Sequence, residues 1–229
     1  MNILITSGGT IEKIDNVRSI SNMSTGRLGS VIADSFLNVP TVTKVFYICT
    51  KTTILPKSEN VEIIYVKSVT DLENAIREVL SHTKIDIIVH CMAVSDYKVK
   101  SVTTLSSLLG NSASSSDYTD GKISSEVDDM VLLMERTPKI ISLFQKLSPE
   151  STLVGFKLLD DAPLEKLIDK GFGVLTKNNC SFVLANDLQD ITKDGHIGYL
   201  IDKNRNYTKY TTKAEIAEAI VSATIVNDQ

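Results

Sequence analysis

Short apolar runs alternate along this chain with longer stretches of helical periodicity. Residues 2–7 (NILITS) and 44–50 (KVFYICT) have the length and content of buried strands, whereas residues 26–38 repeat apolar side chains at the spacing of one helix face. Two neighbouring parallel strands need a crossover connection, which is usually a helix. The alternation therefore predicts an α/β fold, with a Rossmann-like, mostly parallel sheet and helices on both faces.

The same alternation continues toward the end of the sequence. Further strands are predicted at residues 61–66, 85–93, 128–135, 152–159 and 180–187, and further helices at 68–83, 137–147, 162–178 and 213–226. The runs 197–202 and 206–210 are predicted to pair as a hairpin. Glycine is a poor helix former, so the helix at 162–178 could break at Gly171 or Gly173.

One segment interrupts the pattern. Residues 101–125 are rich in Ser, Thr and Gly and show little periodicity, which is typical of a long loop that is functional or disordered. We therefore predict one domain over residues 1–229, with a mobile loop at about 98–121.

Composition and charge exclude several classes of protein. The formal net charge of −4 argues against a nucleic-acid partner, and no apolar run approaches the roughly 20 residues that span a bilayer. The N-terminus lacks the features of a signal peptide. Cys49, Cys91 and Cys180 show no CxxC spacing, so neither a disulfide nor a zinc site is expected. We predict a cytoplasmic protein with no membrane partner and no metal-ligating residues.

Polar or glycine-rich sequence follows four of the predicted strands. These segments are TSGGT (6–10), CMAVSDY (91–97), Lys157 with the acidic residues after it, and Asn186 with Asp187. Each one alone is more simply a connecting loop. Ligands of open parallel sheets bind beyond the carboxyl ends of the strands, so the four together favour a site at that edge.

The segment ISNMSTGRLG places many polar groups just before a predicted helix. Ser24, Thr25 and Gly26 could hold an anion at the free N–H groups of the helix start, or Ser24 or Thr25 could simply cap the helix. Gly8 and Gly9 allow a ligand close to the backbone, or form a tight turn. The phosphate motifs GxxxxGK[ST] and GxGxxG are absent, which weakens a P-loop NTPase and a standard dinucleotide enzyme.

The residues by themselves leave different functions open. Tyr118 and Lys122 match the Tyr-x-x-x-Lys pair of short-chain NAD(P)-dependent oxidoreductases, but Asp120 and Gly121 make the required helix improbable. A non-catalytic nucleotide-binding module also fits. Composition and spacing therefore indicate a nucleotide- or anion-binding α/β domain and favour an enzyme.

Several motifs stand in one order over nearly the whole chain. They are ITSGGTIEKIDNVRSISNMSTGRLG (5–29), AVSDY (93–97), GKI (121–123), TPKII (137–141), VGF (154–156) and LTKNNCSFVLAND (175–187). In this combination the chain resembles phosphopantothenate–cysteine ligase, or phosphopantothenoylcysteine synthetase, of coenzyme A biosynthesis. The likeness is to the free-standing bacterial form, because no flavin-dependent decarboxylase domain precedes it. The first motif is highly specific, whereas VGF and AND are weak alone.

The resemblance implies a ligase reaction in two steps. CTP activates the carboxylate of 4′-phosphopantothenate as an acyl-cytidylate and releases pyrophosphate. The amine of L-cysteine then attacks the acyl carbon and CMP leaves. The resemblance also implies Mg²⁺ as a cofactor that neutralises the triphosphate, and a homodimer in which each subunit helps to cover the other's site.

The resemblance also suggests roles for individual residues. The catalytic candidates are Asn22, required for turnover of the acyl-nucleotidylate, Lys122, which closes over the triphosphate, and Arg18, near the substrate. Candidates for nucleotide contacts are Asp96, His90, Cys91, Met92, Lys122, Pro138, Lys139, Ile140, Ile141, Phe156 and Lys177. Candidates for substrate contacts are Gly8, Gly9, Ser24, Gly26 and Asn186.

The chain departs from the family pattern at a few positions. Ser124 and Ser125 replace a basic run, Gly173 stands at or near the place of a second lysine, and Lys157 follows GF where many bacterial members have Ala. These changes leave the choice between CTP and ATP open, although the contacts near Asp96 and Phe156 favour CTP.

Overall fold

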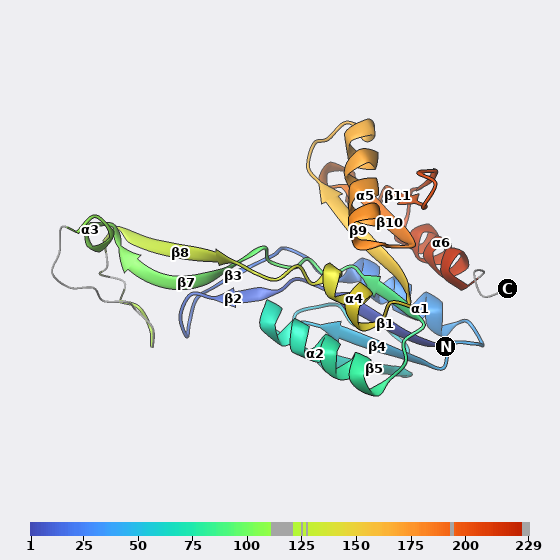
Figure 1. Cartoon of the computed structure of the whole chain (residues 1–229), viewed down its shortest axis with the longest axis horizontal. Helices are drawn as coiled ribbons and strands as arrows, with labels where there is room; N and C mark the ends of the chain where they lie inside the picture. The colour runs from blue at the N-terminus through green and yellow to red at the C-terminus, as the bar shows by residue number, and fades with distance from the viewer. Residues whose placement is uncertain (111–120, 125, 127, 193–194, 226–229) are drawn as a thin grey trace.

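The computed structural model describes residues 1–110, 121–124, 126, 128–192 and 195–225. Its body is built around an eight-stranded sheet of order β12-β11-β10-β9-β6-β1-β4-β5 (Figure 1). The strands are β1 (Asn2–Ser7), β4 (Lys44–Cys49), β5 (Val61–Tyr65), β6 (Ile87–His90), β9 (Thr152–Leu159), β10 (Phe182–Asp187), β11 (Gly198–Ile201) and β12 (Tyr207–Tyr210). Neighbouring strands pair in parallel throughout the part β10-β9-β6-β1-β4-β5. Strands β11 and β12 add the expected antiparallel hairpin at one edge, next to β10. The mostly parallel sheet is thus confirmed.

Helices cover both faces of the sheet, as the sequence predicts. One face carries α1 (Arg27–Leu37) and α6 (Lys213–Ile225), and the other carries α2 (Val69–His82), α4 (Ile141–Leu147) and α5 (Leu164–Asn178). Successive side chains of a strand point to opposite faces, so β1 contributes side chains to the hydrophobic cores on both faces of the sheet. Ile3 and Ile5 pack beneath α1 and α6, whereas Leu4 packs beneath α2, and all three are fully buried.

Two helices show how particular residues shape the fold, one at its start and one in its interior. Helix α2 begins at a capping box in which Ser68 and Asp71 satisfy each other's backbone N–H groups. Helix α5 runs without a break through Gly171 and Gly173, so a break there is wrong. A Cβ atom on Gly171 would lie 2.6 Å from Cδ1 of Ile201, so this glycine allows the helix to pack closely on the sheet.

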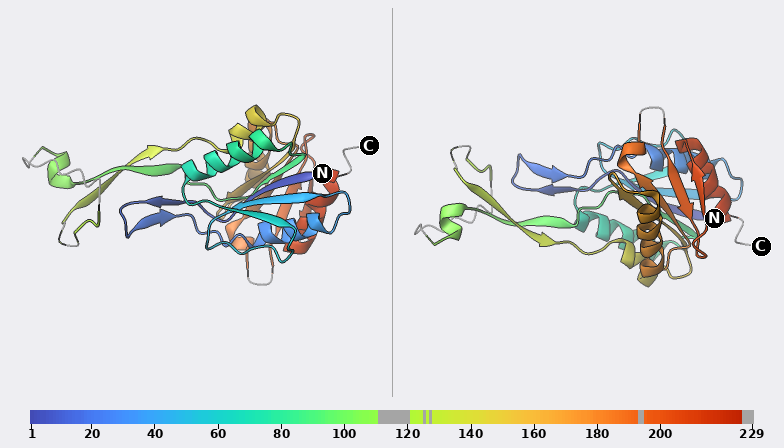
Figure 2. Two further views of the ribbon diagram at one scale, coloured as in Figure 1. Left: turned by 90° about the horizontal axis from the view of Figure 1, so that it is seen from below. Right: turned by 90° about the horizontal axis from the view of Figure 1, so that it is seen from above.

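An arm projects from one end of the body and was not foreseen as a unit. It consists of the hairpin β2 (Ile11–Lys13) and β3 (Ser19–Ser21) and the ribbon β7 (Tyr97–Thr104) and β8 (Met130–Arg136) (Figures 1 and 2). Both pairs are antiparallel, and β2 contacts β7. The strand predicted at 128–135 exists, but it pairs in the arm and not in the main sheet.

The predicted mobile loop at about 98–121 is wrong over its first part. Strand β7 and the short helix α3 (Leu105–Leu108) occupy most of residues 98–110. The segment pairs with β8, a partner far along the chain that composition does not reveal. Residues 111–120, with Tyr118, lie outside the described residues.

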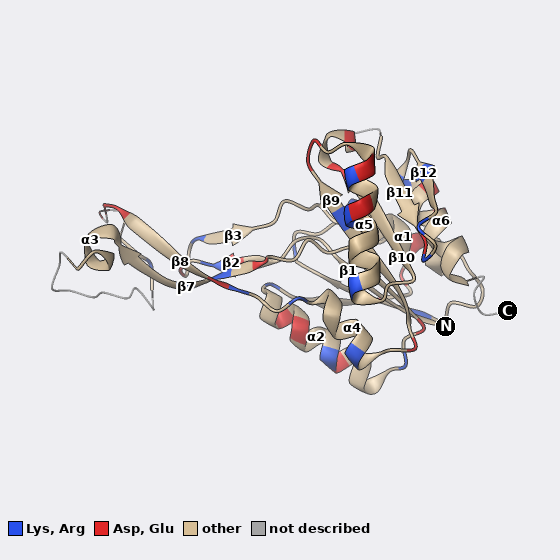
Figure 3. Ribbon diagram, turned by 45° about the horizontal axis from the view of Figure 1, so that its top comes forward, with Lys and Arg blue, Asp and Glu red and all other residues tan. Residues whose placement is uncertain are grey.

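Charged side chains are distributed unevenly between body and arm. Lys, Arg, Asp and Glu mark the outer surfaces of α2 and α5 (Figure 3). In the ribbon β7–β8 the charged residues Lys98, Lys100, Glu135 and Arg136 lie at the end nearer the body, and the paired segments 101–104 and 130–133 are uncharged. Several large apolar side chains of the arm are exposed, namely Leu105, Leu108, Leu109, Met130, Leu133 and Met134. In the described part of the chain no helix is long and apolar enough to cross a membrane. The cytoplasmic location stays a prediction.

Candidate active site

A cavity of about 390 Å³ opens at the carboxyl ends of β1, β6, β9 and β10, and we call it the edge pocket. Six of the sequence-predicted site residues line it: Ser24, Gly26, Cys91, Met92, Phe156 and Asn186. A larger cavity of about 640 Å³ lies between β12 and α6 and contains none of the predicted residues. We place the candidate site in the edge pocket, because this is where parallel sheets bind their ligands.

The N-terminus of α1 forms one wall of the edge pocket. The helix starts after Gly26, whose φ of 71° lies in the left-handed region and which offers no side-chain cap. The hydroxyls of Ser7 and Tyr47 both donate to the Gly26 carbonyl, at 3.2 and 3.4 Å. A Cβ atom at Gly26 would lie 2.2 Å from Cγ2 of Thr53. The core thus fixes a helix start that lines the pocket and has no side-chain cap at Gly26, although the N–H of Arg27 donates to the Thr25 hydroxyl at 3.4 Å.

Three further residues with nitrogen-bearing side chains line the edge pocket, of which only the first lies in a quoted motif. They are Arg27, His196 and Lys213. Burial and the nearby charge of Arg27 lower the pKa of Lys213. Burial, and then the charge of Lys213, lower the pKa of His196 to about 4. His196 and Lys213 lie far from the quoted motifs in sequence, so no local motif could have found them. Arg27 and Lys213 give this pocket a positive character.

Asn22 lies beside the edge pocket, next to the glycines that follow β1. Its backbone N–H donates to the Thr10 carbonyl at 3.3 Å, and its side-chain oxygen lies 3.5 Å from the Ser95 hydroxyl. A Cβ atom at Gly9 would come within 2.4 Å of the Asn22 carbonyl oxygen, so glycine is needed for this approach. Gly8 accepts a hydrogen bond from the Ala93 N–H at 2.8 Å. Among the described residues, none accepts a hydrogen bond from the Asn22 side-chain amide.

A second group of predicted nucleotide contacts gathers at the start of α4. Asp96 and Lys139 form an exposed ion pair, and the N–H of Thr137 donates to the Asp96 carbonyl at 3.0 Å. Lys177 is exposed in the last turn of α5. The group also contains Pro138, Ile140 and Ile141, and its two helices are joined where Ser142 donates to Asn178 at 3.1 Å.

The side chains of His90 and Cys91 are occupied inside the protein. His90 Nδ1 lies 2.7 Å from the Thr6 hydroxyl, and its ring packs edge-to-face on Phe144. Burial lowers the pKa of His90 to about 4 and raises that of Cys91 to about 12. Cys91 is therefore not a thiolate near neutral pH, and these two residues can serve a ligand through their backbone.

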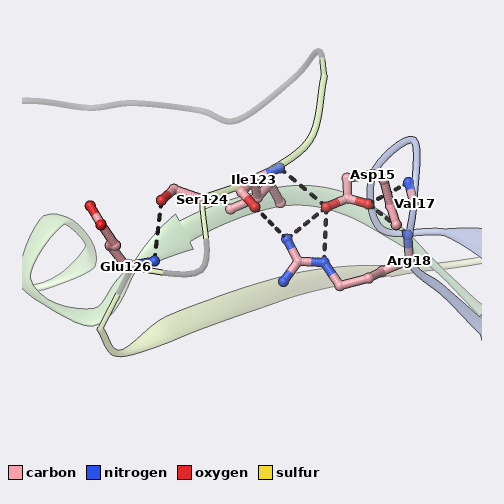
Figure 4. A network of polar contacts seen from close by, with 6 residues as sticks. All are labelled: Asp15, Val17, Arg18, Ile123, Ser124 and Glu126. Atoms are coloured by element: carbon pink, nitrogen blue, oxygen red, sulfur yellow. Dashed lines mark hydrogen bonds and ion pairs between the residues drawn. The ribbon is translucent and has the colours of Figure 1, made fainter.

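Arg18 and Lys122 lie together in the arm, away from the edge pocket. The Arg18 guanidinium donates to the Asp15 carboxylate at 2.7 and 2.9 Å and to the Ile123 carbonyl at 3.0 Å (Figure 4). The Asp15 side chain is 2% exposed and also accepts the N–H of Ile123 at 3.2 Å. Lys122, the neighbour of Ile123, is exposed. We call residues 15–18 and 121–124 the arm cluster; Asp15 was missed in the sequence.

The described residues do not form a metal cage of their own. They contain no group of three or more His, Cys, Asp and Glu side chains that could hold an ion. Asp96 is a single exposed carboxylate, already paired with Lys139. A divalent cation at this site would therefore depend on oxygens of a bound phosphate ligand.

Comparisons with known proteins show the family to which the chain is related. The family described as the DNA/pantothenate metabolism flavoprotein C-terminal domain matches residues 1–106 and 111–227. The coenzyme A biosynthesis bifunctional protein CoaBC of Thermococcus kodakarensis is 33% identical over 223 residues, which are 95% of this chain and 49% of that protein. CoaBC of Methanocaldococcus jannaschii is 29% identical over 222 residues, 96% of this chain and 49% of that protein. The chain thus spans about half the length of these relatives.

A solved structure covers nearly the whole chain. The DNA/pantothenate metabolism flavoprotein from Streptococcus pneumoniae superposes with a TM-score of 0.86, at 37% sequence identity and over 97% of each chain. The similarity therefore includes both the body and the order of the elements that carry the edge pocket.

Proposed function

We propose that this chain, which belongs to the family of the DNA/pantothenate metabolism flavoprotein C-terminal domain, is a phosphopantothenate–cysteine ligase of coenzyme A biosynthesis. Its relatives of that pathway support the assignment. The observation that carries it is the edge pocket, where predicted substrate and nucleotide contacts meet the N-terminus of α1 beside Asn22.

In the first proposed step, the carboxylate of 4′-phosphopantothenate attacks the α-phosphorus of CTP and pyrophosphate leaves. Negative charge develops on phosphate oxygens during this step. The start of α1 lines the edge pocket, and its N–H groups can stabilise that charge, as can Lys122 when an arm is brought to the pocket. The product is an acyl-cytidylate.

In the second proposed step, the cysteine amine attacks the acyl carbon and CMP leaves. Charge then develops on the acyl oxygen, where a neutral hydrogen-bond donor is needed. Asn22 fits this role, because its side-chain amide donates to no other described residue and lies beside the cavity. The preference for CTP over ATP, and Mg²⁺ as a charge-neutralising ion that enters with the triphosphate, belong to the same proposal.

We further propose that two copies of the chain form a homodimer through their arms. The arm cluster lies away from the edge pocket of its own body. Large apolar side chains are exposed on β8 (Met134) and at α3 beyond the ribbon (Leu108 and Leu109). Contiguous exposed apolar surface marks an interaction site. In such a dimer, Arg18 and Lys122 would reach the edge pocket of the partner. A monomeric mass by light scattering, with full activity at the same concentration, would refute the dimer.

The decisive experiment measures pyrophosphate release with 4′-phosphopantothenate, L-cysteine and each of the four nucleoside triphosphates in turn. The ligase assignment predicts release that requires phosphopantothenate, is faster with CTP than with ATP, and yields phosphopantothenoylcysteine. Equal or faster turnover with ATP would reject the nucleotide preference. Absence of product with every nucleotide would reject the assignment itself.

A further inference from the structure

Ser95 is a nearly buried serine that contacts the predicted catalytic amide. It stands in the segment after β6, it is 6% exposed, and its hydroxyl donates to the side-chain oxygen of Asn22 at 3.5 Å. This distance is long for a hydroxyl hydrogen bond, and bonds at catalytic residues commonly shorten in the complex with substrate. In the described part of the chain, no other residue forms a hydrogen bond with the Asn22 side chain. Ser95 is thus the protein group that can set the direction of this amide.

Two buried threonines fix the main chain of Ser95. The N–H of Ser95 donates to the Thr10 hydroxyl oxygen at 2.8 Å, and the Ser95 carbonyl accepts the Thr137 hydroxyl at 2.5 Å. Thr10 is fully buried and Thr137 is 9% exposed. The backbone carbonyl of Thr10 also accepts the N–H of Asn22 at 3.3 Å. Thr10 therefore contacts both residues and holds the serine hydroxyl opposite the amide.

The amide of Asn22 can serve the second proposed step in only one of its two orientations. Its N–H group must donate to the acyl oxygen, where negative charge develops. The side-chain oxygen must then face away from that charge, because two electron-rich oxygens repel each other. The Ser95 hydroxyl lies at this oxygen and donates to it. If the amide turned by 180°, an acceptor would face the acyl oxygen and the stabilisation would be lost.

We propose that Ser95 is a positioning residue for Asn22, whose hydroxyl holds the amide oxygen and so keeps the amide N–H group available for the acyl oxygen. Thr10 and Thr137 support Ser95 in turn. The inference rests on the proposed ligase function, because that reaction defines which amide orientation is productive. A donor that is oriented before the charge forms stabilises it without reorganisation during the reaction. Ser95 therefore belongs to the second chemical step, although it touches no reacting atom.

The first test measures the two chemical steps separately, by rapid quench and mass spectrometry of the full chain. Ser95→Ala should form the acyl-cytidylate at the wild-type rate but should react with cysteine roughly 3- to 10-fold more slowly, because one hydrogen bond is lost. Ser95→Thr keeps a hydroxyl and should restore most of the lost rate. Ser151→Ala is the matched control, because it removes a hydroxyl that donates to the Ile85 carbonyl at 2.6 Å just before β9. It should behave like wild type in both steps.

The second test separates positioning from a purely structural role of Ser95. In a double-mutant cycle, Ser95→Ala should slow the cysteine-dependent decay of the adduct when Asn22 is present. The same substitution should have no further effect on that decay in the Asn22→Ala variant, because the group that Ser95 positions is already gone. Equal slowing in both backgrounds would overturn the inference, since Ser95 would then act without Asn22.

A measurement without substrates distinguishes this inference from the ligase assignment. The 15N relaxation of the Asn22 side-chain amide, whose signal is identified by its loss in Asn22→Asp, reports how firmly the amide is held. The amide should be rigid in wild type and in Ser151→Ala, and more mobile in Ser95→Ala. This result in a protein that makes no phosphopantothenoylcysteine would uphold the contact and reject the ligase. Unchanged relaxation in Ser95→Ala, with both steps at the wild-type rate, would reject the positioning role and leave the ligase standing.

Discussion

The edge pocket and the arm cluster hold their candidate residues in different ways. The pocket residues stand at the ends of strands whose side chains are fully buried, such as Ile5 in β1 and Val89 in β6. In the arm cluster two side chains join residues 15–18 to the segment that carries Lys122, because Asp15 accepts the N–H of Ile123 and Arg18 donates to the Ile123 carbonyl. Close-packed cores resist displacement, whereas a joint made by a few polar side chains weakens when one of them changes. The pocket is thus set by the fold, and the arm cluster by a local network.

The largest effect is expected from a substitution at the edge pocket. Asn22→Asp is nearly isosteric, but it replaces a donor with an acceptor and adds negative charge beside the developing oxyanion. Loss of one such donor typically costs roughly 100- to 1000-fold in rate. We expect the variant to form acyl-cytidylate, to react poorly with cysteine, and to accumulate the adduct to about one per site. Mass spectrometry of quenched reactions measures this.

The control for Asn22→Asp is the first step of the reaction, measured as pyrophosphate release by the same variant. Pyrophosphate should still be released in a burst of about one equivalent per site. A folded variant that forms no adduct would instead place Asn22 in the first step or in substrate binding.

A somewhat smaller effect is expected from the charge carried by the arm cluster. Lys122→Gln should slow pyrophosphate release by roughly 10- to 100-fold, because a charge-assisted contact to the triphosphate is lost. Lys100→Gln removes an equally exposed lysine from β7 and is the matched control. Normal pyrophosphate release by Lys122→Gln would show that this lysine is an ordinary surface charge.

The smallest expected effect concerns the hydrogen bonds that join residues 15–18 to residues 121–124, which we call the joint. Asp15→Asn keeps the shape of the side chain but weakens its bonds to Arg18 and Ile123, so residues 121–124 should become more sensitive to limited proteolysis. Pyrophosphate release should fall less than in Lys122→Gln. Because β1 and β6 do not depend on this network, the melting temperature of the body should change little. If variant and wild type were cleaved at the same rate, Asp15 would not hold residues 121–124 in place.

The pH dependence of the arm cluster sharpens the same comparison. The Arg18 side chain, followed by backbone N–H groups, holds the pKa of Asp15 well below its ordinary value of 3.8. A depressed pKa means that the stabilisation is fully present above the unfolded-state value and is lost only as pH falls through the folded value. Proteolysis of residues 121–124 in wild type should therefore not vary between about pH 5 and 8. A change in the proteolysis rate within that pH range would show that a titratable group other than Asp15 holds these residues.

Local sequence was sufficient for most of the body. A continuous apolar run located β1, because a strand covered on both faces buries nearly every side chain. Apolar periodicity located α1 and α2, because a helix that faces a core repeats its buried side chains at a fixed interval. The glycines beside β1 and the helix start at Gly26 were found for the same reason, since turns and close approaches demand particular residues.

Tertiary structure decided the rest. Strand β7 was mistaken for a loop because its stability comes from pairing with β8, a partner that no local pattern identifies. Gly171 was suspected of breaking α5, although it serves close packing of that helix on the sheet. His196 and Lys213 have no motif, and folding alone places them together with Arg27. Sequence determines what each segment prefers by itself, whereas contacts between distant segments depend on the folded chain, which alone sets their geometry and electrostatics.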